Sequence, residues 1–519
     1  MLDEVHEECG ISAVQVKEGK GSTEKGLFYI YKLLLNLQNR GQLSAGFTTY
    51  NNNRPQLLST FKNIGSVNEV FKTSDRYKSL DIFRKYAGSK GIGHVRYATC
   101  GKDDQTSAQP FERLHGRKWK WFSIGFNGQI ANYVELRKVL LDKAEYHIIQ
   151  DVDTEIIMHY TSRILNRSKS QPDLKDVFAE ISTQFEGAYN IAFINGMGET
   201  VVIRDPNGFR PVSYGKVDDA NLVASETNAL VNCGVDPYKF KSLEPGQMAY
   251  MNGGDIEIKR YAKCKKKSLC MFEYVYFSNV SSVFDDESVY RARVRLGQEL
   301  AKLETEKITK DHIVVPVPDT SKAAGDSMAY QLGIPSKEGL IRNRFVGRTF
   351  IEGVSRQDKI SNKYSVLRRV LEGKKVLLVD DSLVRGATAK QIVRYLKKEG
   401  GAKEVHLRIS CPPIIGPCFY GIDMTTIGEL LVPRFMKDPA NAECIDQNTL
   451  DEIAKYLGAD SIIFQTIPGL FRALNKPESE LCLACLNAKY PTPFGNRLYK
   501  EAKTNFKEGK KSKRTYECH

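Results

Sequence analysis

The sequence lacks the features that mark exported and membrane-spanning proteins. Its longest strongly apolar stretch, residues 26–37, is interrupted by Lys32 and is far shorter than the roughly 20 residues that a spanning helix needs. The first eight residues, MLDEVHEE, contain four acidic residues and no apolar run, whereas a secretory signal has a basic start and an apolar centre. We therefore expect a cytoplasmic protein. Its odd number of cysteines, 11, argues against a disulfide framework and leaves metal binding, catalysis or plain reduced thiols.

Proline is scarce, at 19 of 519 residues, and no segment repeats with a period of 20 to 50 residues. These absences exclude collagen-like, mucin-like, solenoid and propeller architectures. The chain is 41% apolar and 27% charged, which is typical of globular proteins, and it is too long for one hydrophobic core, so we expect two large domains. The net charge of +14 suits a phosphate-bearing small substrate as well as nucleic acid, and charge alone does not choose between them.

The pattern of the chain changes near residue 260. Short strand-like segments mixed with amphipathic helices precede that point and indicate stacked α and β layers. A basic run at residues 259–268 has the composition of an exposed connector. After it, strand, helix and strand alternate, most clearly over residues 374–382, 387–401 and 402–411, which predicts a βαβ unit in an open parallel sheet. Ligands of such sheets bind beyond the carboxyl ends of the strands.

One motif, VLLVDDSLVRGAT at residues 376–388, lies at such a strand end. Backbone amides of the loop around Gly386, at a helix N-terminus, suit an anion, and the Thr388 hydroxyl adds a donor. The paired acids Asp380 and Asp381 can accept hydrogen bonds from vicinal sugar hydroxyls or hold Mg²⁺. A capped helix after a strand would explain Gly386 but not two adjacent acids.

This motif resembles the phosphoribosyl-diphosphate signature of type I phosphoribosyltransferases. The resemblance implies that the acids bind the ribose and that the following loop binds the 5′-phosphate, with Ala387 where a second Thr is common. Residues 315–325, VPVPDTSKAAG, resemble the diphosphate loop of these enzymes, and residues 347–351, GRTFI, resemble the start of their flexible loop. The implied contacts to phosphoribosyl diphosphate are Asp319, Thr320, Ser321, Lys322, Arg348, Asp380, Asp381, Ser382, Arg385, Gly386, Ala387 and Thr388. The implied Mg²⁺ ligands are Ser321, Asp380 and Asp381.

The first half of the chain carries a second set of motifs after Cys9, namely LQNRGQLSAG, GHVRYAT, FNGQIAN, DVDTE, GAYNIAFI, RDPNGFRP and ASET, in this order. Together they resemble the glutaminase domain of N-terminal-nucleophile amidotransferases. From Cys9 to about Pro491 the chain resembles the glutamine phosphoribosyl-diphosphate amidotransferases. The resemblance implies an αββα glutaminase domain followed by a type I phosphoribosyltransferase domain. We expect a propeptide at 1–8, the glutaminase domain at 9–258, the transferase domain at 259–455, a metal-binding segment at 456–498 and a disordered basic tail at 499–519.

The resemblance also assigns roles in glutamine hydrolysis. Cys9 is the nucleophile, and its own α-amino group is the base that removes the thiol proton. Arg96 suits the α-carboxylate of glutamine as a planar fork, and Asp153 suits its α-ammonium group. Asn127 and the backbone N–H of Gly128 stabilise the oxyanion.

Seven residues separate Cys9 from Met1, so the α-amino base exists only if residues 1–8 are removed. Some members of the family carry such a propeptide. The chain departs from the family at Phe126, where His is usual, and at Leu43, where an acid is usual, and we expect altered packing rather than loss of chemistry. It also departs at residues 278–282 and after Ile351, near the interface of the two sites. The changes at residues 278–282 and after Ile351 bear on how glutamine hydrolysis is coupled to the transferase reaction.

Cys482 and Cys485 form a C-x-x-C half-site that by itself fits zinc, an iron–sulfur cluster or two free thiols. The branch of the family that has propeptides carries a structural 4Fe–4S cluster on four cysteines. The matching positions here are Cys270, Cys418, Cys482 and Cys485. The resemblance therefore implies a cluster that holds the C-terminal segment against the sheet domain.

The implied activity is that of an amidotransferase acting on a sugar phosphate, a glycosyltransferase. Ammonia from glutamine displaces diphosphate from phosphoribosyl diphosphate and gives 5-phosphoribosylamine, the first committed step of purine synthesis. The resemblance also implies a homotetramer inhibited by purine nucleotides, with neither nucleic acid nor membrane as a partner. The alternatives are an amidotransferase with another acceptor and a non-catalytic sensor of phosphoribosyl diphosphate or nucleotides.

Overall fold

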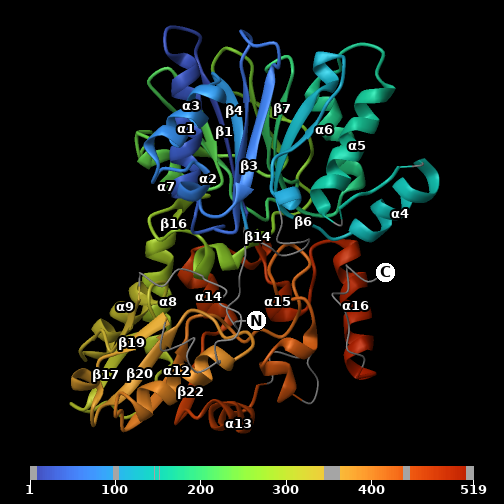
Figure 1. Cartoon of the computed structure of the whole chain (residues 1–519). Coiled ribbons are helices and arrows are strands. Elements are labelled where there is room, and N and C mark those ends of the chain that lie inside the picture. The colour runs from blue at the N-terminus through green and yellow to red at the C-terminus, as the bar shows by residue number, and fades with distance from the viewer. Residues whose placement is uncertain are drawn as a thin grey trace.

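The computed structural model describes residues 9–97, 105–144, 146–150, 152–343, 363–436 and 445–509. It has an upper body built from the first half of the chain and a lower body built from the second half (Figure 1). The expected propeptide at 1–8, Arg348 and residues 351–362 of the expected flexible loop lie outside the described residues.

Two antiparallel sheets stack face to face in the first half. Apolar side chains between them form a common core, among them Ile11 of β1, Ile92 of β4 and Ala192 of β7. The first sheet contains, in spatial order, β11 (Lys241–Ser242), β9 (Ser213–Val217), β10 (Ala220–Ala224), β1 (Gly10–Val16), β4 (Lys90–Arg96), β2 (Ser44–Tyr50) and β3 (Leu58–Ile64). The second contains β13 (Glu257–Arg260), β12 (Gln247–Met251), β8 (Thr200–Ile203), β7 (Gly187–Asn195), β6 (Phe122–Ile130) and β5 (Phe111–Arg113).

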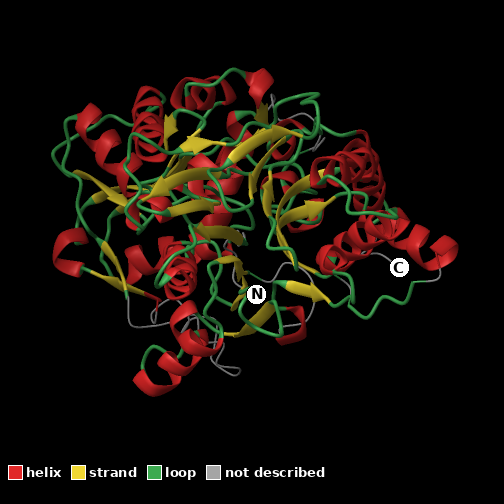
Figure 2. Cartoon of the chain, turned by 90° about the horizontal axis from the view of Figure 1, so that it is seen from above, coloured by secondary structure: helices red, strands yellow, loops and turns green. Residues whose placement is uncertain are grey.

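Helices cover the outer face of each sheet. On the first sheet, Leu27, Ile30 and Leu34 of α1 are spaced three and four residues apart and pack against Val14 and Phe47. This layer contains α1 (Ser22–Asn36), α2 (Val67–Val70), α3 (Arg76–Lys85) and α7 (Thr227–Asn232). The layer on the second sheet contains α4 (Tyr133–Ala144), α5 (Asp153–Arg167) and α6 (Leu174–Gln184). The expected αββα arrangement is present, with strands enclosed between helices (Figure 2).

A parallel sheet organises the second half. Its order is β17 (His312–Pro316), β20 (Lys375–Asp380), β21 (Glu404–Ile409) and β22 (Ser461–Phe464). β20, α12 and β21 form the βαβ unit predicted from the sequence, and Gly401 follows α12 with a φ of 70°. The helices around this sheet are α8 (Val289–Lys302), α9 (Lys322–Leu332), α12 (Ala387–Lys398), α13 (Gln447–Leu457) and α14 (Ile467–Leu474). Smaller elements are a π-helical turn (Glu273–Phe277), β15 (Val283–Phe284), β16 (Glu287–Ser288), β18 (Leu340–Arg342), β19 (Tyr364–Val366) and α11 (Arg368–Leu371).

Three expected boundaries were wrong. The glutaminase sheet extends to Arg260, and Tyr261 and Ser268 are buried, so the basic run at 259–268 is not simply an exposed connector. β22 belongs to the transferase sheet although it lies beyond residue 455. Residues 499–507, expected to be disordered, belong to α16 (Pro493–Lys507), because an apolar stripe recurs at helical spacing between the basic residues.

The C-terminal segment bridges the two halves. β14 (Leu269–Cys270) pairs in parallel with β23 (Leu481–Cys482), and α15 (Ala484–Asn487) follows. Side chains of α16 pack with Phe209 of the first half and Tyr420 of the second, whose rings stack with centroids 4.4 Å apart. Among the described residues, no helix is both long and apolar enough to cross a membrane.

Candidate functional site

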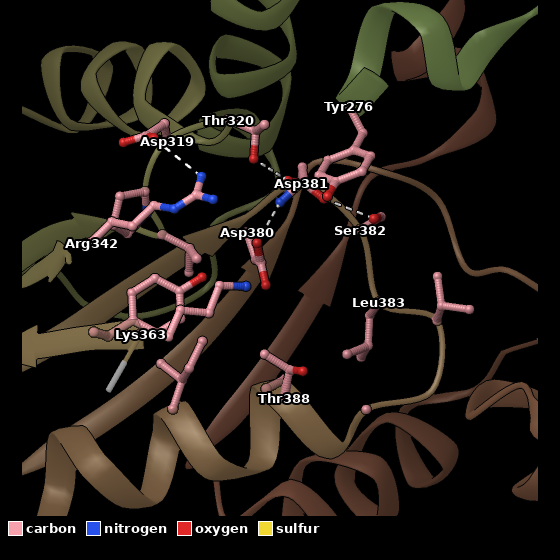
Figure 3. A pocket seen from close by; sticks show the side chains of 17 residues that line it. Tyr276, Asp319, Thr320, Arg342, Lys363, Asp380, Asp381, Ser382, Leu383 and Thr388 are labelled. Carbon is pink, nitrogen blue, oxygen red and sulfur yellow. Dashed lines mark hydrogen bonds and ion pairs between the residues drawn. The ribbon is translucent and has the colours of Figure 1, made fainter. Parts of the chain in front are cut away.

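An open cavity of about 760 Å³, its mouth included, lies at the carboxyl ends of β17 and β20 (Figure 3). Seven of the residues predicted to bind phosphoribosyl diphosphate line it, together with apolar side chains. These seven are Asp319, Thr320, Asp380, Asp381, Ser382, Gly386 and Thr388. The sheet topology places them together because the ends of adjacent parallel strands meet at one edge.

The two acids in this cavity are buried and adjacent. Asp380 ends β20, and Asp381 accepts hydrogen bonds from the hydroxyls of Thr320 and of Ser382, the latter over 2.8 Å. Burial, followed by the neighbouring carboxylate of Asp381, raises the pKa of Asp380 above its ordinary value. Burial also raises the pKa of Asp381. Two carboxylates that resist ionisation in the same buried place form a ready site for a cation or for sugar hydroxyls.

Loops after the strands complete the cavity. The Ser321 hydroxyl lies 3.4 Å from Asp380, at the start of α9. Gly386 is the N-terminal cap of α12 and has a φ of 84°, a conformation that favours glycine. The backbone therefore turns tightly into α12, and the first turn of this helix faces the cavity through Thr388.

Four predicted contacts do not line the cavity. Ser321 is buried beneath it, and Ala387 begins α12. The amino group of Lys322 lies 2.7 Å from Glu338. Arg385 donates to Glu429 over 2.6 Å and to the carbonyl of Asp423 over 2.9 Å.

Four residues with polar side-chain groups that the sequence analysis did not single out line the same cavity: Tyr276, Arg342, Lys363 and Tyr364. Tyr276 comes from the π-helical turn, and Arg342 from β18 lies 3.4 Å from Asp319. Lys363 points its amino group toward Asp380 (Figure 3). Burial lowers the pKa of Lys363 to about 8. Lys363 belongs to the stretch after Ile351. In the sequence, only the position of that stretch beside the expected flexible loop indicated that one of its residues could reach the cavity.

Arg293 holds the turn that carries Tyr276. It is buried, and it donates to the carbonyls of Tyr274, Tyr276 and Ser278 over 2.8–2.9 Å. Its charge also favours the ionised form of Asp381. Arg293 therefore connects one wall of the cavity to its acidic centre.

The second candidate site is in the first half, at the start of β1. Cys9 precedes this central strand, and its thiol lies 3.8 Å from the carbonyl of Tyr97. Arg96 is the last residue of β4, which pairs with β1 in antiparallel register, and it is buried. The pairing of Gly10 with Val95 thus places Cys9 beside the end of β4 that carries Arg96.

The facing sheet supplies the residues expected to stabilise the oxyanion. Asn127 lies on β6 and is 1% exposed, and its Nδ2 has no hydrogen-bond partner among the described residues. Gly128 follows with a φ of 142°, and a Cβ there would lie 2.0 Å from the carbonyl oxygen of Ala188. Asp153 begins α5 and accepts from the backbone N–H of Ile130 over 2.9 Å. A buried amide donor without a partner is costly unless a ligand uses it.

Two domain families match the chain: the glutamine amidotransferase domain at residues 94–232 and the phosphoribosyl transferase domain at residues 287–414. Amidophosphoribosyltransferase of Archaeoglobus fulgidus is 34% identical over 488 residues, which cover 93% of this chain and 98% of that protein. Amidophosphoribosyltransferase of Bacillus subtilis is 34% identical over 501 residues, which cover 95% of this chain and 96% of that protein. This chain belongs to the amidophosphoribosyltransferase family.

A solved structure agrees with this assignment. Glutamine phosphoribosylpyrophosphate (PRPP) amidotransferase from B. subtilis, complexed with ADP and GMP, aligns with a TM-score of 0.78 at 34% identity. The alignment covers 94% of this chain and 98% of that one. The predicted order, a glutaminase domain followed by a phosphoribosyltransferase domain, is therefore confirmed.

Phe126, one of the departures from the amidophosphoribosyltransferase family pattern, packs into the core between β6 and its helices. Its backbone N–H donates to Gln109 over 2.7 Å, and its carbonyl accepts from His94 Nε2 over 2.9 Å. Burial lowers the pKa of His94 to about 3, so this imidazole is neutral. Hydrogen bonds from the backbone of Phe126 to two neutral side chains, those of Gln109 and His94, thus hold β6 in place directly before Asn127.

A smaller cavity lies where the C-terminal segment meets both halves. Four cysteines line it, together with Arg210, Tyr420 and apolar side chains. They are the four named from the family resemblance: Cys270, Cys418, Cys482 and Cys485. The β14–β23 pairing places Cys270 opposite Cys482, and Cys418 Sγ accepts from the backbone N–H of Tyr420 over 3.4 Å. Burial raises the pKa of each of the four thiols.

Proposed function

We propose that this chain hydrolyses glutamine in its first half and uses the ammonia in its second half to convert phosphoribosyl diphosphate to 5-phosphoribosylamine. Glutamate and diphosphate are the other products. The observation that carries the proposal is the presence, in one chain, of two features: a cysteine before β1 with an unpartnered amide donor on β6 of the facing sheet, and a cavity with paired buried acids at parallel strand ends. The membership of the amidophosphoribosyltransferase family supports it.

In the transferase cavity, Asp380 and Asp381 would bind the ribose hydroxyls, and the first turn of α12 would bind the 5′-phosphate. The acids also fit Mg²⁺, because a divalent cation relieves the cost of ionising both carboxylates in a buried place. The ion would be held by Asp380, Asp381 and the Ser321 hydroxyl, and it would neutralise the departing diphosphate. Lys363 and Arg342 add positive charge at the rim of the same cavity.

In the glutaminase site, the Cys9 thiol attacks the side-chain amide carbon of glutamine after its proton passes to the α-amino group. The negative charge that develops on the amide oxygen is stabilised by Asn127 Nδ2 and by the backbone N–H of Gly128. Arg96 and Asp153 hold the two charged ends of the amino acid. This mechanism requires removal of residues 1–8, because a peptide nitrogen has no basic lone pair.

The cysteine cavity suits a structural 4Fe–4S cluster. Four thiols converge on it, of which Cys482 and Cys485 belong to buried residues, and Arg210 favours the ionised form of Cys270. Among the described residues, no three cysteine sulfurs lie within 4.8 Å of one another, so the proposal of a cluster rests on the family resemblance and on the four thiols that line one cavity.

Two further properties belong to the proposal: a homotetrameric assembly and inhibition by purine nucleotides. The relative from B. subtilis was solved with ADP and GMP, and a cavity that accepts a ribose phosphate can accept a nucleotide monophosphate by the same contacts. Sedimentation of the full chain as a monomer at micromolar concentration would contradict the assembly.

The experiment that tests the reaction measures phosphoribosylamine formation with each substrate alone and with both. We expect product only when glutamine, phosphoribosyl diphosphate and Mg²⁺ are all present, with ammonia able to replace glutamine. Glutamine hydrolysis that is indifferent to phosphoribosyl diphosphate would indicate another acceptor. Binding of both ligands without turnover would indicate a sensor.

A further inference from the structure

One edge of β6 carries an inference about glutamine hydrolysis. β6 pairs with β5 only up to Ile124, and no strand in the described part of the chain pairs with that edge beyond it. On its other side β6 pairs with β7 without interruption from Phe122 to Ile130. In an antiparallel pair, the backbone N–H and C=O of successive residues point alternately toward the partner strand and away from it. Beyond Ile124, every second residue of β6 therefore presents its backbone groups to the free edge.

Phe126 shows which residues face this edge. Its N–H donates to Gln109 Oε1 over 2.7 Å, and its carbonyl accepts from His94 Nε2 over 2.9 Å. Both backbone groups of Phe126 therefore point away from β7. Gly128 lies two residues further along, so its backbone N–H points to the same free edge.

A second anchor lies on the other side of Gly128. The backbone N–H of Ile130 donates to Asp153 over 2.9 Å, in agreement with the alternation. Gly128 thus lies midway between two residues whose backbone groups are held by side chains from other elements. Its N–H is one of the two proposed oxyanion donors, and the direction of that N–H depends on how firmly both neighbours are held.

We propose that His94 and Gln109 are positioning residues for glutamine hydrolysis. They hold both backbone groups of Phe126, and the two proposed oxyanion donors, Asn127 and Gly128, follow it directly. A rotation of the backbone at Phe126 would turn both donors together. Donors that are held in place before the reaction stabilise developing charge without the cost of reorientation. This inference rests on the proposed function, because it assigns a role to residues that support the oxyanion site.

The hydrogen bonding of His94 supports this role independently. Its side chain is fully buried, and Nδ1 has no hydrogen-bond partner among the described residues. A carbonyl only accepts, so Nε2 carries the ring proton, and burial lowers the pKa of His94 to about 3, which leaves Nδ1 without a proton. A buried nitrogen without a partner costs stability that an apolar side chain would not cost. The hydrogen bond to the strand that carries the oxyanion donors gives this side chain a use.

Gln109 is itself held in place. It is buried, and Lys62 donates to the carbonyl of Ala108, the preceding residue, over 2.5 Å. Both anchors use the backbone of Phe126, whose own side chain packs in the apolar core of the second sheet. The anchoring therefore does not require the His that the family usually has at this position.

The test uses protein that begins at Cys9, assayed with phosphoribosyl diphosphate and Mg²⁺ present. Leu has no hydrogen-bonding group, so His94→Leu and Gln109→Leu each remove one anchor. We expect kcat for glutamine hydrolysis to fall between about 10-fold and 100-fold with little change in KM, since a misplacement of about 1 Å can cost about 10²-fold. His94→Gln, which can place an amide N–H near the position of Nε2, should recover most of the rate. His94→Asn, whose amide lies closer to the backbone, should not.

Lys90→Met is the matched control. Lys90 begins β4, the strand of His94, and its buried amino group donates to the carbonyl of Gly198 over 2.9 Å. Its loss also removes a buried hydrogen bond to a backbone carbonyl, so we expect a lower melting temperature with an unchanged kcat. Phosphoribosylamine formation from ammonia should be unchanged in every variant. Alkylation of Cys9 by iodoacetamide should also keep the rate of the parent, because it develops no charge on a carbonyl oxygen.

The outcomes separate this inference from the proposed function. A parent that begins at Cys9 and does not hydrolyse glutamine would contradict the proposed function, and the inference with it. With an active parent, an unchanged kcat in both Leu variants, an equal loss in Lys90→Met, or a matching loss of Cys9 alkylation would overturn the inference alone. If His94→Leu does not fold, equal rates for His94→Gln and His94→Asn would overturn it.

Discussion

Arg40 donates a hydrogen bond from Nε to the backbone carbonyl of Cys9 over 3.3 Å. The same guanidinium lies 2.8 Å from Glu226 and 2.7 Å from Glu273, and all three side chains are fully buried. Glu273 lies 3.5 Å from Arg210, which lines the cysteine cavity. A continuous chain of buried charges therefore connects the backbone of the proposed nucleophile to the proposed cluster site.

Replacing Arg40 tests how much this network of buried charges contributes to the stability of the fold. Arg40→Met leaves two buried carboxylates without their common partner, an effect of about 3–5 kcal/mol for a broken buried pair. We expect the melting temperature to fall on the order of 10 °C. Arg167→Met, which breaks an exposed pair with Glu180, should shift it by no more than about 2 °C. Equal melting temperatures for the two variants would contradict the role assigned to Arg40.

Asp380→Asn should stabilise the ligand-free protein near neutral pH while abolishing binding of phosphoribosyl diphosphate. The pKa of Asp380 is raised in the folded state, chiefly by burial and then by Asp381. Between its ordinary pKa and this raised value the unfolded chain is ionised and the folded chain retains a proton. The stability contributed by this group is therefore full at low pH and is lost as pH rises through that window.

The measurement for Asp380→Asn is thermal unfolding from pH 4 to 8 in the absence of Mg²⁺ and substrate. The difference between variant and parent should grow in favour of the variant as pH rises. Asp311→Asn, an exposed acid at the other end of the same sheet, is the control and should leave the profile unchanged. If Asp380→Asn were less stable than the parent at pH 8, the ionisation of Asp380 beside Asp381 would not destabilise the folded protein.

The features of the transferase cavity that were predicted correctly are those that one continuous stretch of sequence determines. The strand, the two acids and the Gly386 turn into α12 follow one another in the chain, so their arrangement needs no distant contact. Tyr276 and Lys363 reach the cavity only through tertiary packing, which the pattern of a single segment does not contain. Arg385 was expected at the phosphate, but a carboxylate 44 residues away, on Glu429, holds it in this structure. The tail was misjudged because its basic composition concealed the apolar stripe of α16.

Asn127→Ala should impair the glutamine reaction selectively. Loss of one oxyanion donor lowers kcat by about 10²–10³-fold, and the donor here is a buried amide without another partner. Phosphoribosylamine formation from ammonia should be unchanged, because it uses only the second half. Asn252→Ala, at an exposed position, should leave both rates unchanged. An equal loss with ammonia and glutamine would mean that the substitution disturbs the fold rather than the oxyanion.

The N-terminus of the active protein should be Cys9. Intact mass and N-terminal sequencing should show that residues 1–8 are absent from every preparation that hydrolyses glutamine. A Cys9→Ala protein should retain ammonia-dependent activity and lose the glutamine-dependent reaction. Glutamine hydrolysis by a chain that still begins at Met1 would falsify the assignment of the α-amino group as the base.

The four cavity cysteines should act as one unit, unlike Cys264, which does not line the cavity. We expect anaerobically purified protein to be brown and to contain about four irons per chain. Cys485→Ser should lose the iron and lower the melting temperature together, because the cavity joins β14, β23 and α15 and the metal-binding free energy adds to the folding free energy. Cys264→Ser should keep both the iron and the melting temperature of the parent. Stoichiometric zinc without visible absorbance would exclude the cluster. It would leave the two proposed half-reactions unchanged, because no step of either reaction takes place in this cavity.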